Sequence, residues 1–365
     1  MDVTFAPMQA AYSERSSRPV AIWLLVGLGM IIIQVLLGGI TRLTGSGLSI
    51  TEWNVVTGTF PPLSESEWLV EFDKYKSTPQ YVLLNSDFTL GEFKYIFFWE
   101  WFHRNWARLI GVVFAIPFLF FWWRGYFKSH MVKPLLILFF LGALQGAIGW
   151  IMVASGLTGD AIYVKPTRLA LHFVFALVLL CYTFWFALQL TVPSSDKVYN
   201  NSLHKPLRWI MALLLLQLIY GAFMAGHKAA TAAPTWPTIN QEWIPSGLYK
   251  SSEGALNWVD NLIFVHFMHR GLAYILVLAV IFYTIQLYKQ TGSLWFYHAR
   301  KWPAILVLLQ VVLGILSVLT STKIIPGQWG IFEWMAQLHQ LVAMLLLLSL
   351  VQLLFLIRRK ALGTT

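Results

Sequence analysis

The 365-residue sequence contains a single cysteine, Cys181, and charged residues make up only 12% of it. One cysteine excludes both an intrachain disulfide and a metal cluster held by several cysteines. The scarcity of charge, together with 58% hydrophobic residues, excludes an ordinary water-soluble domain. Acidic residues are also few, at 16 against 26 lysines and arginines. This composition is typical of a membrane protein that crosses the bilayer several times.

Long apolar runs account for most of the chain. A helix needs about 20 apolar residues to cross the hydrocarbon layer. Eight such runs lie near residues 20–40, 97–122, 134–154, 168–191, 208–226, 261–287, 303–320 and 333–357. We therefore predict an all-α polytopic membrane protein with eight transmembrane helices, which places both ends of the chain on the same side.

Basic residues show which side this is. They concentrate in the end segments and in alternate short loops, for example at Arg18, Arg124, Lys128, Lys301 and Arg358. By the positive-inside rule these segments and both termini are cytoplasmic, and the long loops 41–93 and 227–260 lie outside. The excess of positive charge then faces anionic lipid and requires no nucleic acid. The first 19 residues match neither a transit peptide nor a cleaved signal. A bacterial inner membrane, with the active side toward the periplasm, is the predicted location.

A short pattern recurs in the odd-numbered predicted helices. Glutamine precedes glycine by four residues at Gln34–Gly38, Gln145–Gly149, Gln217–Gly221 and Gln310–Gly314. The even-numbered helices each carry a histidine, at His103, His172, His269 and His339. The chain therefore reads as two tandem four-helix bundles of the same orientation, residues 1–195 and 196–365. The glutamine–glycine pattern favours close helix packing over catalysis.

The four histidines fall near the outer ends of their helices, at similar predicted depth. Two imidazoles that face each other across a helix bundle are the usual axial ligands of a haem iron. The repeat favours pairing His103 with His172 and His269 with His339, although pairing across the halves stays open. Zinc is disfavoured because cysteine is absent from these pairs and only one carboxylate is near. For a single histidine in an apolar helix, a hydrogen-bonded packing role is the more common one.

One carboxylate distinguishes the halves. Glu100-x-x-His103-Arg104 aligns with His266-x-x-His269-Arg270, so only the N-terminal half has an acid one turn from its histidine. Such a group can move protons, or it can be a structural partner of Arg104 or Arg108. The role of His266 is open. The outer arginines could bind haem propionates through their planar guanidinium groups or could reach the membrane surface instead; they are Arg42, Arg104, Arg168 and Arg270.

Several of these segments together resemble the haem A synthase family over nearly the whole chain. The carrying segments are Gly38-Gly-Ile-Thr-Arg-Leu-Thr-Gly-Ser-Gly47, Thr51-Glu-Trp53, Phe60-Pro-Pro62, Glu100-x-x-His-Arg104, Arg168-Leu-Ala-Leu-His172, His269-Arg270 and Leu338-His-Gln340. The resemblance implies oxidation of the C8 methyl group of haem O to the formyl group of haem A, a cofactor of terminal oxidases. Water supplies the oxygen, and the electron acceptor is unknown.

The resemblance also implies a role for each histidine pair. His269 and His339 would hold haem B, and His103 and His172 would bind the substrate haem O, with Glu100 as the essential acid. Some bacterial members have two cysteines in the first outer loop, and this chain has none. Expected partners are haem O, membrane lipid, an electron acceptor and haem O synthase, and a homo-oligomer is left open. The alternative functions are a di-haem b-type cytochrome that relays electrons and, less favoured, a transporter.

Overall fold

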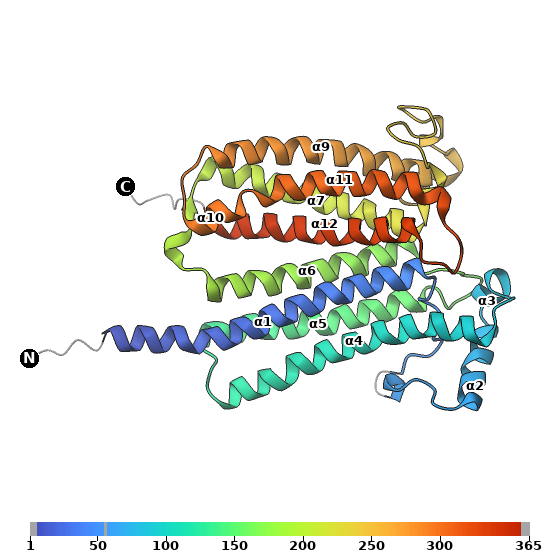
Figure 1. The fold of residues 1–365 in the computed structure, drawn as a ribbon, viewed down its shortest axis with the longest axis horizontal. Coiled ribbons are helices and arrows are strands. Elements are labelled where there is room, and N and C mark those ends of the chain that lie inside the picture. The colour runs from blue at the N-terminus through green and yellow to red at the C-terminus, as the bar shows by residue number, and fades with distance from the viewer. Residues whose placement is uncertain (1–5, 55–56, 359–365) are drawn as a thin grey trace, which may run out of the picture.

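The computed structural model describes residues 6–54 and 57–358 (Figure 1). Eight helices in this part of the chain are long and apolar enough to cross a membrane, as predicted. They are α1 (Ala6–Leu43), α4 (Leu90–Trp123), α5 (Ser129–Ala154), α6 (Pro166–Thr191), α7 (Asn201–Gly226), α9 (Leu262–Tyr288), α11 (Trp302–Thr320) with the short α10 (Leu294–Ala299) before it, and α12 (Ile331–Leu356). Helix α1 begins and helix α12 ends at the same end of the molecule (Figure 1).

Defined caps fix where the histidine-bearing helices begin. Thr89 caps α4 in a reciprocal arrangement with Glu92, so α4 starts at Leu90 rather than near residue 97. Asn261 caps α9 through the backbone N–H groups of Ile263 and Phe264. Because α4 begins earlier than its apolar run, His103 lies several turns from the start of its helix, whereas the other three histidines lie within about two turns.

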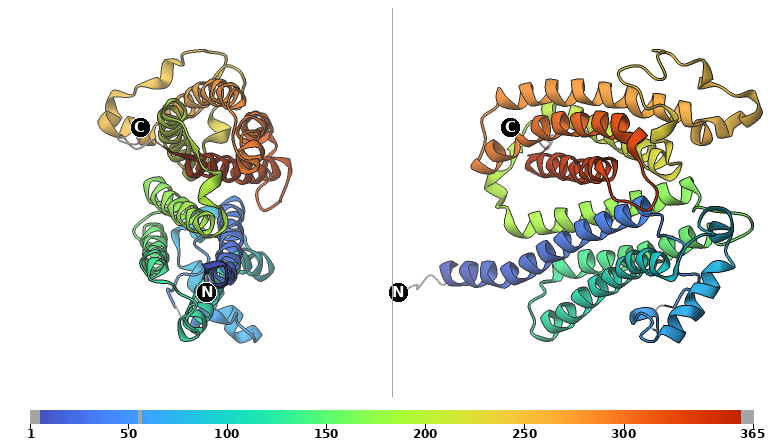
Figure 2. Two further views of the ribbon diagram at one scale, coloured as in Figure 1. Left: turned by 90° about the vertical axis from the view of Figure 1, so that its left-hand side faces the viewer. Right: turned by 45° about the vertical axis from the view of Figure 1, so that its right-hand side comes forward.

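The long helices pack mainly with neighbours from their own half of the chain. Helix α1 contacts α4 and α6, and α5 contacts α6; α7 contacts α9, α9 contacts α11, and α11 contacts α12. The two sets lie side by side (Figure 2) and meet where α6 and α1 contact α7 and α12. Helix α12 is the most buried span, with Met344, Leu350 and Leu353 wholly inside. The division into two tandem bundles at residue 195 stays a prediction.

Polar side chains of α12 reach across the junction between the two sets of helices. Gln337 donates to the carbonyl of Leu36 at 2.9 Å, and Gln340 donates to that of Val35 at 2.7 Å. Both acceptors belong to α1. A Cβ atom at Gly39 would lie 2.7 Å from Oε1 of Gln340, so the absence of a side chain there permits this approach.

The first long loop, residues 41–93, which the charge pattern predicts to be the first outer loop, contains two short helices: α2 (Glu65–Lys76) and α3 (Pro79–Leu84). Phe72 and Tyr75 of α2 stack on Phe93 at the start of α4. Burial raises the pKa of Tyr75 to about 12, so its hydroxyl stays protonated and donates to Gln80. Gln80 in turn donates to the carbonyl of Ile162 between α5 and α6. The loop is thus fixed to two sides of the mouth.

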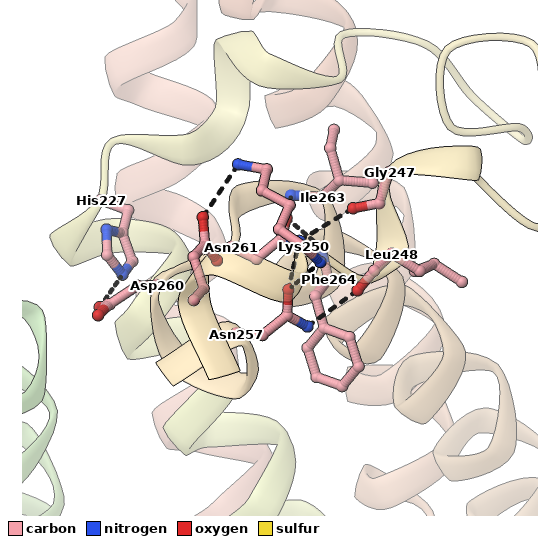
Figure 3. A network of polar contacts seen from close by, with 10 residues as sticks. His227, Gly247, Leu248, Lys250, Asn257, Asp260, Asn261, Ile263 and Phe264 are labelled. Atoms are coloured by element: carbon pink, nitrogen blue, oxygen red, sulfur yellow. Dashed lines mark hydrogen bonds and ion pairs between the residues drawn. The ribbon is translucent and has the colours of Figure 1, made fainter. Parts of the chain in front are cut away.

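The second outer loop is fixed to the start of α9 (Figure 3). It contains short 3-10 helices at Ala229–Ala232, Ser246–Leu248 and Ser251–Leu256, followed by α8 (Asn257–Asp260). Asn261 donates to the carbonyl of Gly247 at 2.9 Å and to Oδ1 of Asn257 at 2.8 Å. Asn257 donates to the carbonyl of Leu248 at 2.9 Å. At the other end of the molecule β1 (Val198–Tyr199) pairs in parallel with β2 (Ile357–Arg358), a contact that the sequence did not predict.

Candidate functional site

All four predicted histidine ligands line one cavity of about 1690 Å³, to which each of the eight long helices contributes. Its volume exceeds the roughly 300–1,000 Å³ of an ordinary small-molecule site. Glu100 and the arginines Arg42, Arg104 and Arg270 line it as well, whereas Arg168 is exposed and does not. The structure therefore brings the predicted site residues together in one space.

Each histidine in the N-terminal half lies against the glutamine and glycine of one repeated pattern. The side-chain nitrogen of Gln34 lies 3.2 Å from Nε2 of His103, and that of Gln145 lies 3.2 Å from Nδ1 of His172. Both amides also donate to the main-chain carbonyl of the histidine that they touch, at 3.2 and 3.1 Å. The glutamine and glycine of each repeated pattern thus surround one imidazole, and we call this arrangement the seat of that histidine.

The C-terminal half repeats this seat. Gln217 lies 3.2 Å from Nδ1 of His269, and Gln310 lies 3.2 Å from Nε2 of His339. His339 differs in one respect, because its Nδ1 lies 3.0 Å from the main-chain carbonyl of Gln310. A carbonyl acceptor fixes the proton on Nδ1, so Nε2 is the unprotonated nitrogen, which here faces the amide of Gln310 and is the one that a metal would bind.

The glycine of each pattern provides the room that the ring needs. A Cβ atom at Gly38, Gly149, Gly221 or Gly314 would lie 3.3, 2.9, 3.2 or 2.9 Å from Cε1 of the facing histidine. Close packing was the predicted role of these glycines. The structure adds that the group packed against them is the imidazole.

Substituting one of these glycines should displace its histidine. Gly149→Ala and Gly314→Ala are each expected to destabilise the protein by about 1–3 kcal/mol through overpacking and to weaken any ligand bound by that histidine. Thermal unfolding and the absorbance of bound pigment would measure the two effects. Gly29→Ala is the matched control, since a Cβ there meets nothing within 4 Å. Equal behaviour of all three variants would contradict the proposed seat.

The geometry of the C-terminal pair fits two axial ligands of one iron. The ring centroids of His269 and His339 are 6.3 Å apart, with an interplanar angle of 73°. Metal–imidazole bonds of about 2 Å on each side would place two rings about 6 Å apart. Among the described residues, no group of three or more His, Cys, Asp or Glu side chains is placed to hold a metal ion alone. Two histidines in a large apolar cavity match a metal that a macrocycle already holds.

The glutamines carry a second sign of a missing partner. Their side-chain oxygens are all buried without a hydrogen-bond partner. Buried polar atoms are normally satisfied, so four equivalent exceptions mark a place where a ligand or water completes the structure. The residues present therefore fit a haem in each half.

Glu100 is buried and fully hydrogen bonded. One carboxylate oxygen accepts from the hydroxyl of Ser49 at 2.7 Å and from the backbone N–H of Ile50 at 2.9 Å. The other lies 2.7 Å from the guanidinium of Arg104. Its sequence-predicted structural partner is thus Arg104, whereas Arg108 donates to the carbonyl of Asn54. Glu100 joins the first outer loop to α4 at the cavity wall.

In the C-terminal half His266 and Arg270 align with Glu100 and Arg104, and they also join their helix to a loop, without a carboxylate. His266 lies 2.6 Å from the carbonyl of Ala229 through Nε2 and 3.2 Å from Arg270 through Nδ1. Arg270 donates to the carbonyls of Ala233 and Thr235, both at 2.7 Å. His266 is therefore a buried link between α9 and the second outer loop. The residue four positions after it supplies the loop contacts, as Arg104 does in the other half.

The cavity-lining arginines bind backbone carbonyls in this structure. Arg104 donates to the carbonyls of Ile50 and Glu52 and lies over the ring of Trp53. A hydrogen bond from Lys74 lowers the pKa of Glu52, which keeps that loop residue ionised. Arg42 lies 3.4 Å from the carbonyl of Ala225.

Sequence reasoning missed the contacts of Ser49 and Ile50 with Glu100, because no spacing in the sequence relates a loop to a helix that lies 50 residues away.

Comparison with known proteins shows the family to which the chain belongs. Residues 21–351 match the family COX15-CtaA, described as cytochrome oxidase assembly protein. The chain is 39% identical over 337 residues to "Heme A synthase" of Flavobacterium psychrophilum, covering 91% of this chain and 96% of that protein. It is 42% identical over 315 residues to "Heme A synthase" of Rhodospirillum centenum, covering 85% and 84%. These matches, together with the eight spans, show that the chain is a multi-pass membrane protein of the COX15-CtaA family.

Proposed function

We propose that this protein is a haem A synthase, an oxidoreductase that converts the C8 methyl group of haem O to a formyl group. Two repeated histidine seats in one cavity, with a buried carboxylate beside only one of them, carry this proposal. The relatives named "Heme A synthase" support the same reaction. Conversion of a methyl group and water to a formyl group releases four electrons and four protons, so the site needs both an electron path and a proton acceptor.

The two halves divide the work in this proposal. His103 and His172 hold the iron of haem O, and His269 and His339 hold haem B. Haem B, when bound, supplies one-electron transfer. The glutamine that touches each ring fixes its orientation, as the outer partners of metal-bound histidines commonly do. His339 is oriented in addition by the carbonyl of Gln310.

Glu100 is the proposed proton acceptor at the substrate. Its side chain is only 3% exposed but lines the cavity, so bulk water does not compete for the proton. The guanidinium of Arg104 lies 2.7 Å from one carboxylate oxygen. Ser49 holds the other carboxylate oxygen.

The remaining features place the reaction in a membrane. We propose a bacterial inner membrane, cytoplasmic termini and a cavity that opens toward the periplasm, in agreement with the basic residues of the inner loops. Arg42, Arg104 and Arg270 are the candidate propionate contacts. The partners are haem O, lipid, an unidentified electron acceptor and haem O synthase. An electron relay is less favoured, because it gives Glu100 no chemical role beside its contacts with the loop.

Haem extraction tests the proposed function. Cells that make haem O and express this chain should accumulate haem A, detected by chromatography of extracted pigments and by mass. Cells with an empty vector should contain haem O without haem A. If the purified protein holds haem B and no haem A forms, the electron relay is the better description.

A further inference from the structure

The two halves differ at one helix boundary. In the C-terminal half α9 packs along α11. The equivalent helices of the N-terminal half, α4 and α5, follow each other in the chain but do not pack along their length. Their rings approach at Phe114 and Phe139, with centroids 6.5 Å apart. Elsewhere α4 and α5 are separated, and residues of both helices between this pair and His103 or Gln145 line the cavity. We call this separation the gap.

Equivalent positions explain why one boundary is open and the other closed. Aligning His103 with His269 and Gln145 with Gln310 pairs three glycines of the N-terminal half with three valines. Gly111 aligns with Val277, Gly142 with Val307, and Gly146 with Val311. Val307 is 1% exposed and belongs to the main core, where Val277 packs against it. A Cβ atom at any of the three glycines would meet nothing within 4 Å.

The gap leads directly into the cavity. Small residues of α4 and α5 line the cavity and are exposed: Ala107, Gly111, Gly142, Ala143 and Gly146. Gln145 lies between Ala143 and Gly146 in the sequence of α5, and its buried side-chain oxygen has no hydrogen-bond partner. Since both helices cross the membrane, this opening faces lipid rather than water. We call it the α4–α5 window.

We infer that the α4–α5 window is the lateral passage by which haem O moves between the bilayer and the His103–His172 seat, with its isoprenoid chain lying between the two helices. This inference rests on the proposed function. Haem O carries two propionates at one edge but has a largely apolar macrocycle and a long hydrocarbon side chain, so it partitions into lipid, and a passage through lipid avoids exposing that chain to water. The seat in the C-terminal half has valines instead and retains its group.

The direction of the difference agrees with the division of roles. A substrate and its product must exchange at each turnover, whereas a resident haem must not. Glycine at three positions removes the side chains that would close the α4–α5 boundary. Valine at the corresponding positions lets α9 and α11 pack. In this inference, the residues between these two helices make one site exchanging and the other retaining.

Valines introduced into the window test the inference. The triple variant Gly111→Val, Gly142→Val and Gly146→Val should lower both haem A formation and the uptake of haem O from lipid vesicles by at least about tenfold. Uptake is followed by the Soret absorbance of purified protein in bilayers, so it does not depend on turnover. The single variants should show graded losses. The triple variant is expected to keep the wild-type amount of haem B, which reports that the protein is folded.

The control places the same substitution away from the window. Gly29→Val lies in α1, where a Cβ also meets nothing within 4 Å, and Gly29 does not line the cavity. It should leave uptake unchanged. Wild-type uptake by the triple variant would overturn the inference and point to access from the outer mouth. Wild-type protein that takes up haem O but forms no haem A would instead contradict the proposed function and leave the window standing.

Discussion

Replacing Glu100 by glutamine is expected to lower the rate of haem A formation by on the order of 10²–10⁴-fold, the usual contribution of a positioned acid or base. Glutamine keeps an oxygen that can accept from Ser49 and Ile50, so the outer loop should stay in place. It cannot take up a proton, and it removes the ion pair with Arg104. Extracted haems, compared at equal amounts of membrane protein, measure the effect.

A second variant separates proton transfer from loop attachment. Ser49→Ala removes one hydrogen bond to Glu100 and leaves the carboxylate and Arg104 intact. If Glu100 acts as a proton acceptor, Ser49→Ala should retain most of the activity while Glu100→Gln loses it. Full activity in Glu100→Gln, or equal losses in both variants, would show instead that Glu100 serves only to hold the loop.

Replacing each of the four histidines should have different effects in the two halves, on bound haem B in one and on haem A formation in the other. His269→Ala and His339→Ala are expected to lower the bound haem B of the purified protein at least about tenfold, because even the outer partners of metal ligands contribute 10–100-fold in affinity. His103→Ala and His172→Ala should keep haem B and lose haem A formation. The Soret absorbance per protein and the extracted pigments measure the two properties.

Two results would contradict this assignment. Loss of haem B in the His103→Ala variant would place the resident group in the N-terminal half. Loss of half the haem B in each of the four variants would indicate a haem in both seats. His266→Ala is the matched control, because His266 is buried in the same helix as His269 but faces Ala229 and Arg270 of the outer-loop contact. It should keep its haem B.

The sequence predicted most of the fold because each membrane-spanning helix requires an apolar run that is easy to recognise. Helices that cross lipid need long apolar runs, and these were visible, as was the repeat of glutamine, glycine and histidine. The boundaries were less predictable where a cap outside the apolar run sets the start, as Thr89 does for α4. The parallel pairing of Val198 with Ile357 could not be predicted, because two residues at opposite ends of a half carry no periodic signal.

For the site, the sequence singled out candidate residues and missed the groups that they contact. It singled out Glu100 and the four histidines because ionisable groups in apolar helices are costly. It did not predict that Glu100 binds the loop at Ser49, or that each Gln-x-x-x-Gly surrounds an imidazole. Such contacts join segments whose separation in the chain has no fixed relation to distance in space. The difference between glycine and valine at the window was present in the sequence, but only the helix packing gave it a meaning.

Two adjacent glycines of α1 serve the two seats together. Gly38 accommodates the ring of His103, and Gly39 accommodates the glutamines of α12, the helix that carries His339. Two consecutive residues of α1 therefore lie against the ring of His103 and against the helix that carries His339. In the proposed function the two sides exchange electrons, and electron transfer weakens steeply with separation. A shift of α1 against α12 would therefore change the distance between the two pairs of histidines, and with it the proposed exchange of electrons.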